Sequence, residues 1–388
     1  MRIVRLMLLC VIVASAAFAA TTTSAQSGPI VAVTVSNEGK SSFYTFTGDS
    51  QQPTLLIEDA GELTYVLSPR GDSYYIYGRD ETDTFVVRYA KLGSDAKRFD
   101  LTPYQILSLP VWSQAGDYLA LTTGTVEGDF SLVVINTADN TVAELKGKFA
   151  FEEKDAVSGV LFGVPFLLYW DTSASLAVVQ MVIPFSEGNN LGLYKLDLSS
   201  ALSTNTISTA QLTPYGKVPR GIYNSVLSPN ALLAATPMAD PNQPIPGYVQ
   251  DSPYLPPNSI LWSDLSAGGE PQPIELPEGV GLDSLTWSQD STRLFFRAGT
   301  YANSSEMVDP KLYSYTIPEN TLTEHGVLPK DADARISQLI ICGERAFWLS
   351  FSTDTTTTLF SASVDALDSP TQLLQEKGYM SLSCHYPQ

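Results

Sequence analysis

Histidine, cysteine and basic residues are scarce in this chain. Its 388 residues include only two histidines, three cysteines and 22 lysines plus arginines, against 41 aspartates plus glutamates, so the formal net charge is −19. So few histidines leave little room for a histidine-rich metal site or for many acid/base relays. The acidity argues against a nucleic-acid partner, because such binding needs a cationic surface that displaces counterions from phosphate. Hydrophobic residues still reach 44%, which excludes a disordered chain.

Long hydrophobic runs are also missing, apart from one short run near the N-terminus. Residues 1–25 are typical of a secretory signal peptide: two arginines, an apolar stretch over residues 6–18, then small residues. Cleavage after Ala19 or after Ala25 fits the rule for small residues, and we favour Ala25. The run is short for a membrane span, and an uncleaved N-terminal anchor is the alternative. We therefore expect residues 26–388 to be exported, to the periplasm or the cell exterior, with no membrane span after cleavage.

One phrase recurs through the rest of the chain. It consists of apolar residues, Ser with Pro or Gln, a turn containing Gly, Asp or Asn, and a second apolar run, as in residues 66–77 and 111–121. Each copy predicts a β-hairpin, and an alternating strand pair follows it, so that one unit is a four-stranded sheet. The copies, two of them worn, are anchored roughly 45–60 residues apart at Ser68, Ser113, Asp171, Ser228, Ser288 and Cys342. This repeat predicts an all-β chain folded as a single β-propeller over residues 26–388.

The two ends of the chain predict how the ring closes. Residues 30–35 and 43–46 supply later strands of a unit whose first strand is missing, and residues 379–384 read as a lone first strand. A blade shared between both ends would leave no unpaired sheet edge. Counting this blade favours seven blades; six is the alternative, because the copy at Asp171 is degenerate.

The repeated phrase resembles the WD40-like repeat of the TolB-type propeller family. Its Ser-Pro-Asp-Gly pattern is matched by Ser68-Pro69-Arg70-Gly71 and by Ser113-Gln114-Ala115-Gly116, although the Asp before Gly is missing from both copies. The resemblance covers most of residues 30–388 and implies a propeller fold, without the N-terminal domain of TolB or the hydrolase domain of related peptidases.

Two cysteines remain once Cys10 leaves with the signal peptide. Cys342 and Cys384 align at equivalent positions of neighbouring units, in a compartment that tolerates disulfides. We predict a disulfide between the last unit and the closing strand. Two separate buried thiols are the alternative, because equivalent points on adjacent blades can lie too far apart.

Catalytic and ligand-binding motifs are not recognisable in the sequence. No Gly-x-Ser-x-Gly elbow or Gly-rich phosphate loop occurs, and we interpret His325 and His385 as surface or structural residues. Carboxylates at 80–83 and 331–333 have a spacing that could hold Ca²⁺, but acidic loops of an acidic protein are more often only solvated. We therefore assign no catalytic residue, metal or cofactor.

Aromatic residues fall into two groups. Trp112, Trp170 and Trp287 recur at equivalent places in the repeat, which predicts packing between blades. Tyr248 and Tyr254 lie instead in a proline-rich insert.

The insert, residues 237–257, is the most distinctive local feature. Proline lowers the entropic cost of holding a loop extended, and tyrosine offers contact area with a polar end. We predict a partner-binding loop with Tyr248, Asp251 and Tyr254 as its contact residues; a passive surface loop is the alternative.

The sequence as a whole favours an exported, monomeric, non-enzymatic propeller that binds a protein or peptide in the cell envelope or outside the cell. The step from fold to function is analogy. The alternatives are an extracytoplasmic enzyme, a polysaccharide lyase or hydrolase with carboxylates at the channel mouth, and a purely structural envelope component.

Overall fold

The structure is a computed structural model of the chain. It describes residues 29–47, 52–92, 99–101, 106–124, 129–152, 160–183, 190–219, 224–248, 256–302, 307–330 and 334–386. The predicted signal peptide, the insert residues Asp251 and Tyr254, and the carboxylates at 331–333 lie outside these ranges.

We call each four-stranded repeat unit a group. The first two groups form one continuous sheet of seven strands, in the order β28-β1-β2-β3-β4-β5-β6. β3 is shared, because its first half pairs with β2 and residues Gly61–Leu67 pair with β4. The strands are β28 (Tyr379–His385), β1 (Ile30–Asn37), β2 (Lys40–Thr47), β3 (Thr54–Leu67), β4 (Ser73–Asp80), β5 (Phe85–Lys91) and β6 (Phe99–Asp100).

The next two groups are joined in the same way, through the ends of β10 and β11. Their strands are β7 (Val111–Trp112), β8 (Tyr118–Gly124), β9 (Asp129–Asn136), β10 (Val142–Glu152), β11 (Val160–Asp171), β12 (Leu176–Val182), β13 (Asn190–Leu196), β14 (Thr206–Ile207) and β15 (Leu212–Pro214). The worn copy at Asp171 thus forms a full group, β11, β12, β13 and β15. The helix α1 (Leu198–Thr204) and the 3-10 turn η1 (Thr209–Gln211) lie between β13 and β15.

The last three sheets have four strands each. They are β16 (Val226–Leu227), β17 (Leu233–Met238), β18 (Ser259–Asp264) and β19 (Gln272–Ile274); β20 (Gly281–Trp287), β21 (Arg293–Tyr301), β22 (Met307–Thr316) and β23 (Thr321–Val327); and β24 (Ala334–Cys342), β25 (Arg345–Ser352), β26 (Thr356–Ser363) and β27 (Thr371–Lys377).

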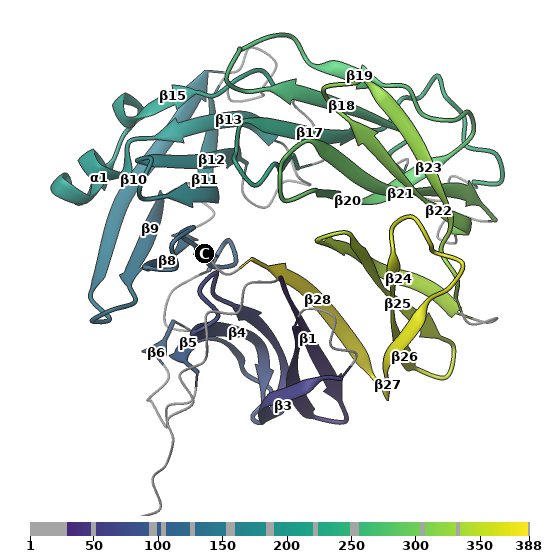
Figure 1. Ribbon diagram of the computed structural model, residues 1–388. Helices are drawn as coiled ribbons and strands as arrows, with labels where there is room; N and C mark the ends of the chain where they lie inside the picture. The colour runs from purple at the N-terminus through teal and green to yellow at the C-terminus, as the bar shows by residue number, and fades with distance from the viewer. Residues whose placement is uncertain are drawn as a thin grey trace, which may run out of the picture.

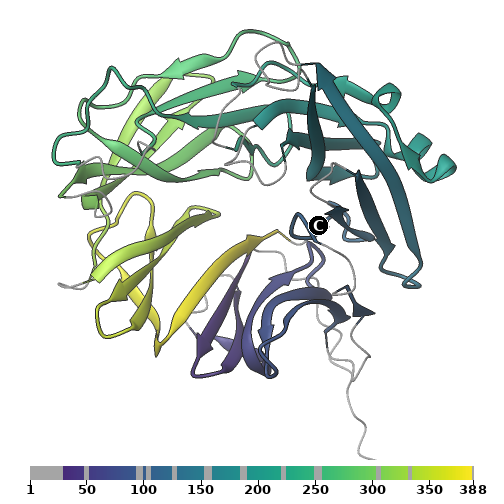
Figure 2. The same cartoon turned by 180° about the vertical axis from the view of Figure 1, so that it is seen from behind.

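The groups follow one another in chain order around a ring (Figure 1). β28, the last strand, lies beside β1, the first, and the view from behind shows the same neighbours (Figure 2). The two strands are antiparallel from Ile30 opposite His385 to Ser36 opposite Tyr379. The predicted all-β propeller is confirmed at the level of its architecture.

The recurring tryptophans pack between groups of strands, as expected. Trp112 is 8% exposed, and its ring lies 6.2 Å from that of Tyr75 in the preceding group. Trp287 donates a hydrogen bond from Nε1 to the Val226 carbonyl, also in the preceding group, over 3.0 Å. These contacts bury large apolar rings where two sheets meet, which stabilises their packing.

The serine of the repeated phrase closes a turn. The Ser68 hydroxyl, fully buried, accepts a hydrogen bond from the Ser73 amide at 3.2 Å, while the Ser68 amide donates to the Ser73 carbonyl at 2.8 Å. Gly71 holds φ +70° in the same turn, a conformation that favours glycine. Ser228 and Ser288 make the equivalent bond. The repeat motif is therefore structural.

Candidate binding face

The ring has two different faces, because neighbouring strands within each group are antiparallel. Connections from first to second and third to fourth strand emerge on one side, which we call the turn face. Connections from second to third strand, and from each group to the next, emerge on the other, the loop face. The repeated serine turns lie on the turn face. The predicted insert, which joins β17 to β18, lies on the loop face.

A buried asparagine fastens the base of the insert. Asn258, 3% exposed, precedes β18 directly. Its Nδ2 donates to the Asp240 carbonyl at 2.9 Å and to the Gln243 carbonyl at 2.7 Å, and its Oδ1 accepts from the Asp240 amide at 2.6 Å. One side chain thus satisfies three backbone groups, and the start and end of the insert are held together.

The described part of the insert packs against the next group of strands. The Tyr248 ring meets the Tyr301 ring edge to face at a centroid distance of 5.8 Å. Gly247 has φ +80°, and a Cβ there would lie only 1.9 Å from the Tyr301 carbonyl oxygen. A Cβ at Gly279 would lie 3.0 Å from the side chain of Pro246. Tyr248 therefore anchors the insert, with its side chain half-buried, while Asp251 and Tyr254 lie outside the described residues.

Replacing Asn258 by Ala tests this anchoring. The change leaves three backbone groups near the insert base without their partner, so we expect the free energy of unfolding to fall by about 1–3 kcal/mol and proteolysis within residues 240–256 to accelerate. Chemical denaturation and timed proteolysis measure the two effects. Asn242→Ala, at an exposed position of the same insert, is the matched control. Equal behaviour of both variants would contradict the clamp.

A second feature of the loop face is an aromatic stack beside an arginine. Phe351 near the end of β25 and Tyr379 at the start of β28 have ring centroids 5.3 Å apart and planes 12° apart. The guanidinium carbon of Arg335, near the start of β24, lies 5.7 Å from the Phe351 centroid. No sequence motif marks this site, because its three residues lie on three strands.

The two histidines are structural in their surroundings. His325 lies on β23 with its side chain 7% exposed; its Nε2 is 2.8 Å from the Ser314 hydroxyl and its Nδ1 is 3.4 Å from the Asp365 carboxylate. Burial lowers its pKa, and the Asp365 charge opposes that shift. His385, at the end of β28, lies 2.7 Å from the Ser383 hydroxyl, and burial lowers its pKa to about 4.

His385 makes stability depend on pH. Its pKa is about 4 in the folded chain against 6.5 for the free group, so protons bind the unfolded state more tightly. The stability that the folded state gains from keeping His385 uncharged is fully present above pH 6.5 and is lost as the pH falls towards 4. Between pH 6.5 and pH 4, the free energy of unfolding of His385→Gln should therefore fall by about 2–3 kcal/mol less than that of the wild type. Denaturation curves at a series of pH values measure the difference, and parallel curves would contradict it.

In the acidic loop at 80–83, the Asp80 carboxylate is hydrogen-bonded within its own turn. The Asp80 carboxylate accepts hydrogen bonds from the hydroxyl and amide of Thr82 at 2.7 and 3.0 Å, and these hold its pKa below its usual range. Arg88 contacts the second carboxylate oxygen at 3.1 Å. Across the described ranges, no three His, Cys, Asp or Glu side chains gather as metal ligands would.

Two open depressions are lined by described residues. One, of about 520 Å³, is bordered by β9 and β10, where Lys148 pairs with Asp129 at 3.3 Å. The other, of about 470 Å³, lies between β13 and the segment after β15, where Lys217 pairs with Glu270. Each contains an ion pair within its own lining.

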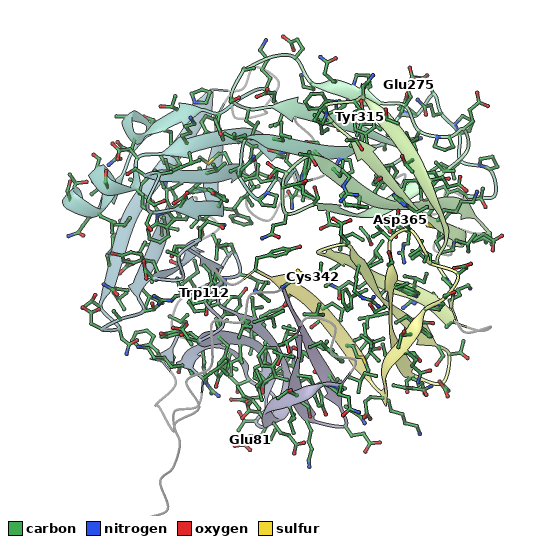
Figure 3. The ribbon with its side chains drawn as sticks, viewed as in Figure 1. Glu81, Trp112, Glu275, Tyr315, Cys342 and Asp365 are labelled. Atoms are coloured by element: carbon green, nitrogen blue, oxygen red, sulfur yellow. A yellow bond between two sulfur atoms is a disulfide. The ribbon has the colours of Figure 1, made fainter. Side chains whose placement is uncertain are left out.

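The predicted cysteines are joined. The structure has a disulfide between Cys342, which ends β24, and Cys384 on β28, with a Cα–Cα distance of 5.6 Å. The side-chain amide of Gln338 holds the same strand: Nε2 donates to the Leu382 carbonyl and Oε1 accepts from the Leu382 amide, both at 2.9 Å. In Figure 3, Cys342 lies towards the middle of the ring, whereas Glu81 lies at its edge.

Comparison with known proteins finds likeness in structure and none in sequence. No protein family and no curated protein matches the sequence. An uncharacterised protein of Listeria monocytogenes is 10% identical, with a TM-score of 0.52 over 89% of this chain and 91% of its own. A protein of Lactobacillus plantarum is 13% identical, with a TM-score of 0.51 over 92% and 99%. TolB of Acinetobacter baumannii is 11% identical, with a TM-score of 0.43 over 92% of this chain and 66% of its own.

The likenesses to the Listeria and Lactobacillus proteins concern the fold alone. Within the described residues, no helix is long and apolar enough to cross a membrane.

Proposed function

We propose that this chain is an exported β-propeller that binds a protein or peptide partner on its loop face. The observation that carries the proposal is the insert between β17 and β18, which is tied at its base by Asn258 and seated on the next group of strands at Tyr301. Because the described residues of the insert are fixed in this way, binding through them would cost little further entropy, as a binding loop requires.

Export is part of the proposal. The N-terminal 25 residues have the pattern of a signal peptide, and the disulfide between Cys342 and Cys384 suits an oxidising compartment. We place the protein in the periplasm or outside the cell, acting as a monomer.

The binding proposal is tested by exchanging the insert. Replacing residues 241–256 with a short Gly-Ser turn keeps Asp240 and Asn258 and should abolish capture of the partner from the native envelope, while the melting temperature changes by only a few degrees. Cross-linking followed by affinity capture measures binding, and circular dichroism measures folding. The matched control replaces residues 266–269, on the turn face, with Gly-Ser. Undiminished capture by the insert variant would reject the proposal.

We further propose a seven-bladed ring closed by β28. The strand pairing supports it: β28 and β1 to β3 make one group of four, and β3 then begins the next. The disulfide and the Gln338 amide join the closing strand to the preceding group.

Removing residues 379–388 tests the closure. The deletion exposes the edge of β1 and the apolar residues that Leu382 covers, so we expect the melting temperature to fall by more than about 10 °C. Cys342→Ser together with Cys384→Ser removes only the disulfide. We therefore expect a smaller fall in melting temperature, equivalent to a loss of about 2–4 kcal/mol in the free energy of unfolding. Thermal denaturation measures both. An unchanged melting temperature of the deletion would contradict the shared blade.

A further inference from the structure

The outermost strands of the ring are protected in different ways. An unpaired strand edge can pair with a strand of another chain, and natural sheets prevent this with short outer strands or with β-bulges. Counting from the group that contains β1, the outermost strands of the second, fourth and fifth groups, β6, β15 and β19, pair over only two or three residues. Those of the first, sixth and seventh groups carry one extra residue each that interrupts their register: Leu56 on β3, His325 on β23 and Leu373 on β27.

β10, the outermost strand of the third group, has neither protection. It pairs with β9 in unbroken register over seven residues, from Val142 opposite Ile135 to Lys148 opposite Asp129. The Asn136 amide donates to the Thr141 carbonyl, next to the first of these pairs. Because hydrogen-bonded pairs alternate along an antiparallel ladder, residues 142, 144, 146 and 148 direct their N–H and C=O groups away from β9. Such a long, regular edge readily pairs with a further strand.

The short strand β14 covers part of this edge. It runs parallel to β10, with Thr206 opposite Lys146 and Ile207 opposite Gly147, and the Lys146 amide donates to the Asn205 carbonyl at 3.4 Å. Gly147 permits the close approach, because a Cβ there would lie 2.7 Å from the Ile207 carbonyl oxygen. A strand from outside the chain cannot pair with β10 where β14 already does.

We call residues 198–210, which include β14, the edge strap. The Asp197 amide donates to the Gln211 carbonyl at 2.9 Å, so the strap leaves and rejoins the hairpin of β13 and β15 at adjacent residues. Its helix α1 lies beside β10 (Figure 1) and is capped by the Asp197 carboxylate. Buried residues of the strap join the hydrophobic core of the third and fourth groups: Leu198, Ala201 and Ile207.

The charges along the covered edge are self-complementary. In an antiparallel pairing of two copies about a twofold axis at Leu145, Glu144 of each copy lies opposite Lys146 of the other. Both side chains are exposed, and both residues direct their backbone groups outwards. Opposite charges stabilise such cross-strand pairs. A second copy of this chain is therefore the partner that the edge fits.

We propose that the edge strap keeps the protein monomeric by occupying the edge through which β10 would otherwise pair with a second copy of this chain. The strap takes the place of the bulge or the short outer strand that protects the other groups. Without it, two copies form a symmetric dimer joined from β10 to β10. The inference goes beyond the proposed function, since the insert belongs to the fifth group.

Replacing the edge strap with a short Gly-Ser turn tests the proposal. Because Asp197 and Gln211 are adjacent, the turn can join β13 to β15 without moving either strand. We expect the full exported chain to be monomeric and the strapless chain to dimerise at concentrations of about 100 µM. Analytical ultracentrifugation over a concentration series measures the mass. The matched control replaces residues 266–269, in the hairpin of β18 and β19, with Gly-Ser and should stay monomeric.

Charge variants distinguish pairing at the edge from non-specific association of the uncovered core. In the strapless chain, Lys146→Glu should weaken dimerisation about tenfold, because two carboxylates then lie opposite each other on both sides of the twofold axis. Adding Glu144→Lys to this variant makes the charges opposite again and should restore the dimer. Lys377→Glu changes an exposed lysine on the outermost strand of the seventh group and should have no effect.

A milder variant covers the case in which the strapless chain does not fold. Thr206→Gly together with Ile207→Gly loosens β14 but leaves Leu198 and Ala201 in the core, and it should dimerise more weakly than the strapless chain. Circular dichroism checks the fold of each variant.

A folded variant that stays monomeric, or association that ignores the charge variants, would overturn the inference. Failure of both strap variants to fold would also overturn it, because the strap would then serve the core alone. Partner capture that depends on the insert is measured separately and is unaffected by either result.

Discussion

The pairing of β28 with β1 joins the last described strand to the first, and much of the molecule depends on it. It gives β1 a neighbour on the edge that no other described strand covers. It also places Cys384 against Cys342 and the Leu382 backbone against the Gln338 amide, so that the last strand is held by a covalent bond and by a pair of hydrogen bonds. The same strand carries Tyr379 to the loop face.

Antiparallel alternation then places the repeated serine turns on one face of the ring and the insert on the other. On the turn face, side-chain oxygens are used within their own turns: the Ser288 hydroxyl accepts from the Arg293 amide, and the Asp264 carboxylate from the Ser266 amide. The loop face carries the insert, the aromatic stack and Arg335. Repeated sequence and candidate function thus lie at opposite ends of the same strands.

Much of the fold could be predicted, because its signals are local. Each serine turn requires only neighbouring residues, and the alternating strands that follow show which side of a sheet is buried. The recurrence of Trp112 and Trp287 at equivalent places correctly indicated packing between groups. The degenerate copy at Asp171 was harder to interpret. There the carboxylate itself accepts the turn's amide hydrogen bonds from Ser173 and Ala174, in place of the usual serine.

The site was less predictable. Proline density marked the insert, but no local pattern showed that Tyr248 packs on Tyr301 or that Asn258 fastens the loop. The stack of Phe351 and Tyr379 beside Arg335 left no signal, because strands β24, β25 and β28 contribute one residue each.

By itself, the sequence determined the acidity of the chain and its repeated hairpins, since each of these depends on composition or on residues close together along the chain. Only the tertiary structure decided which face carries the long connections, that Cys342 lies within bonding distance of Cys384, and that a ring and a cation from distant strands share one surface. The physical reason is that contacts between strands depend on register and on the order of groups around the ring, which no short stretch of sequence encodes.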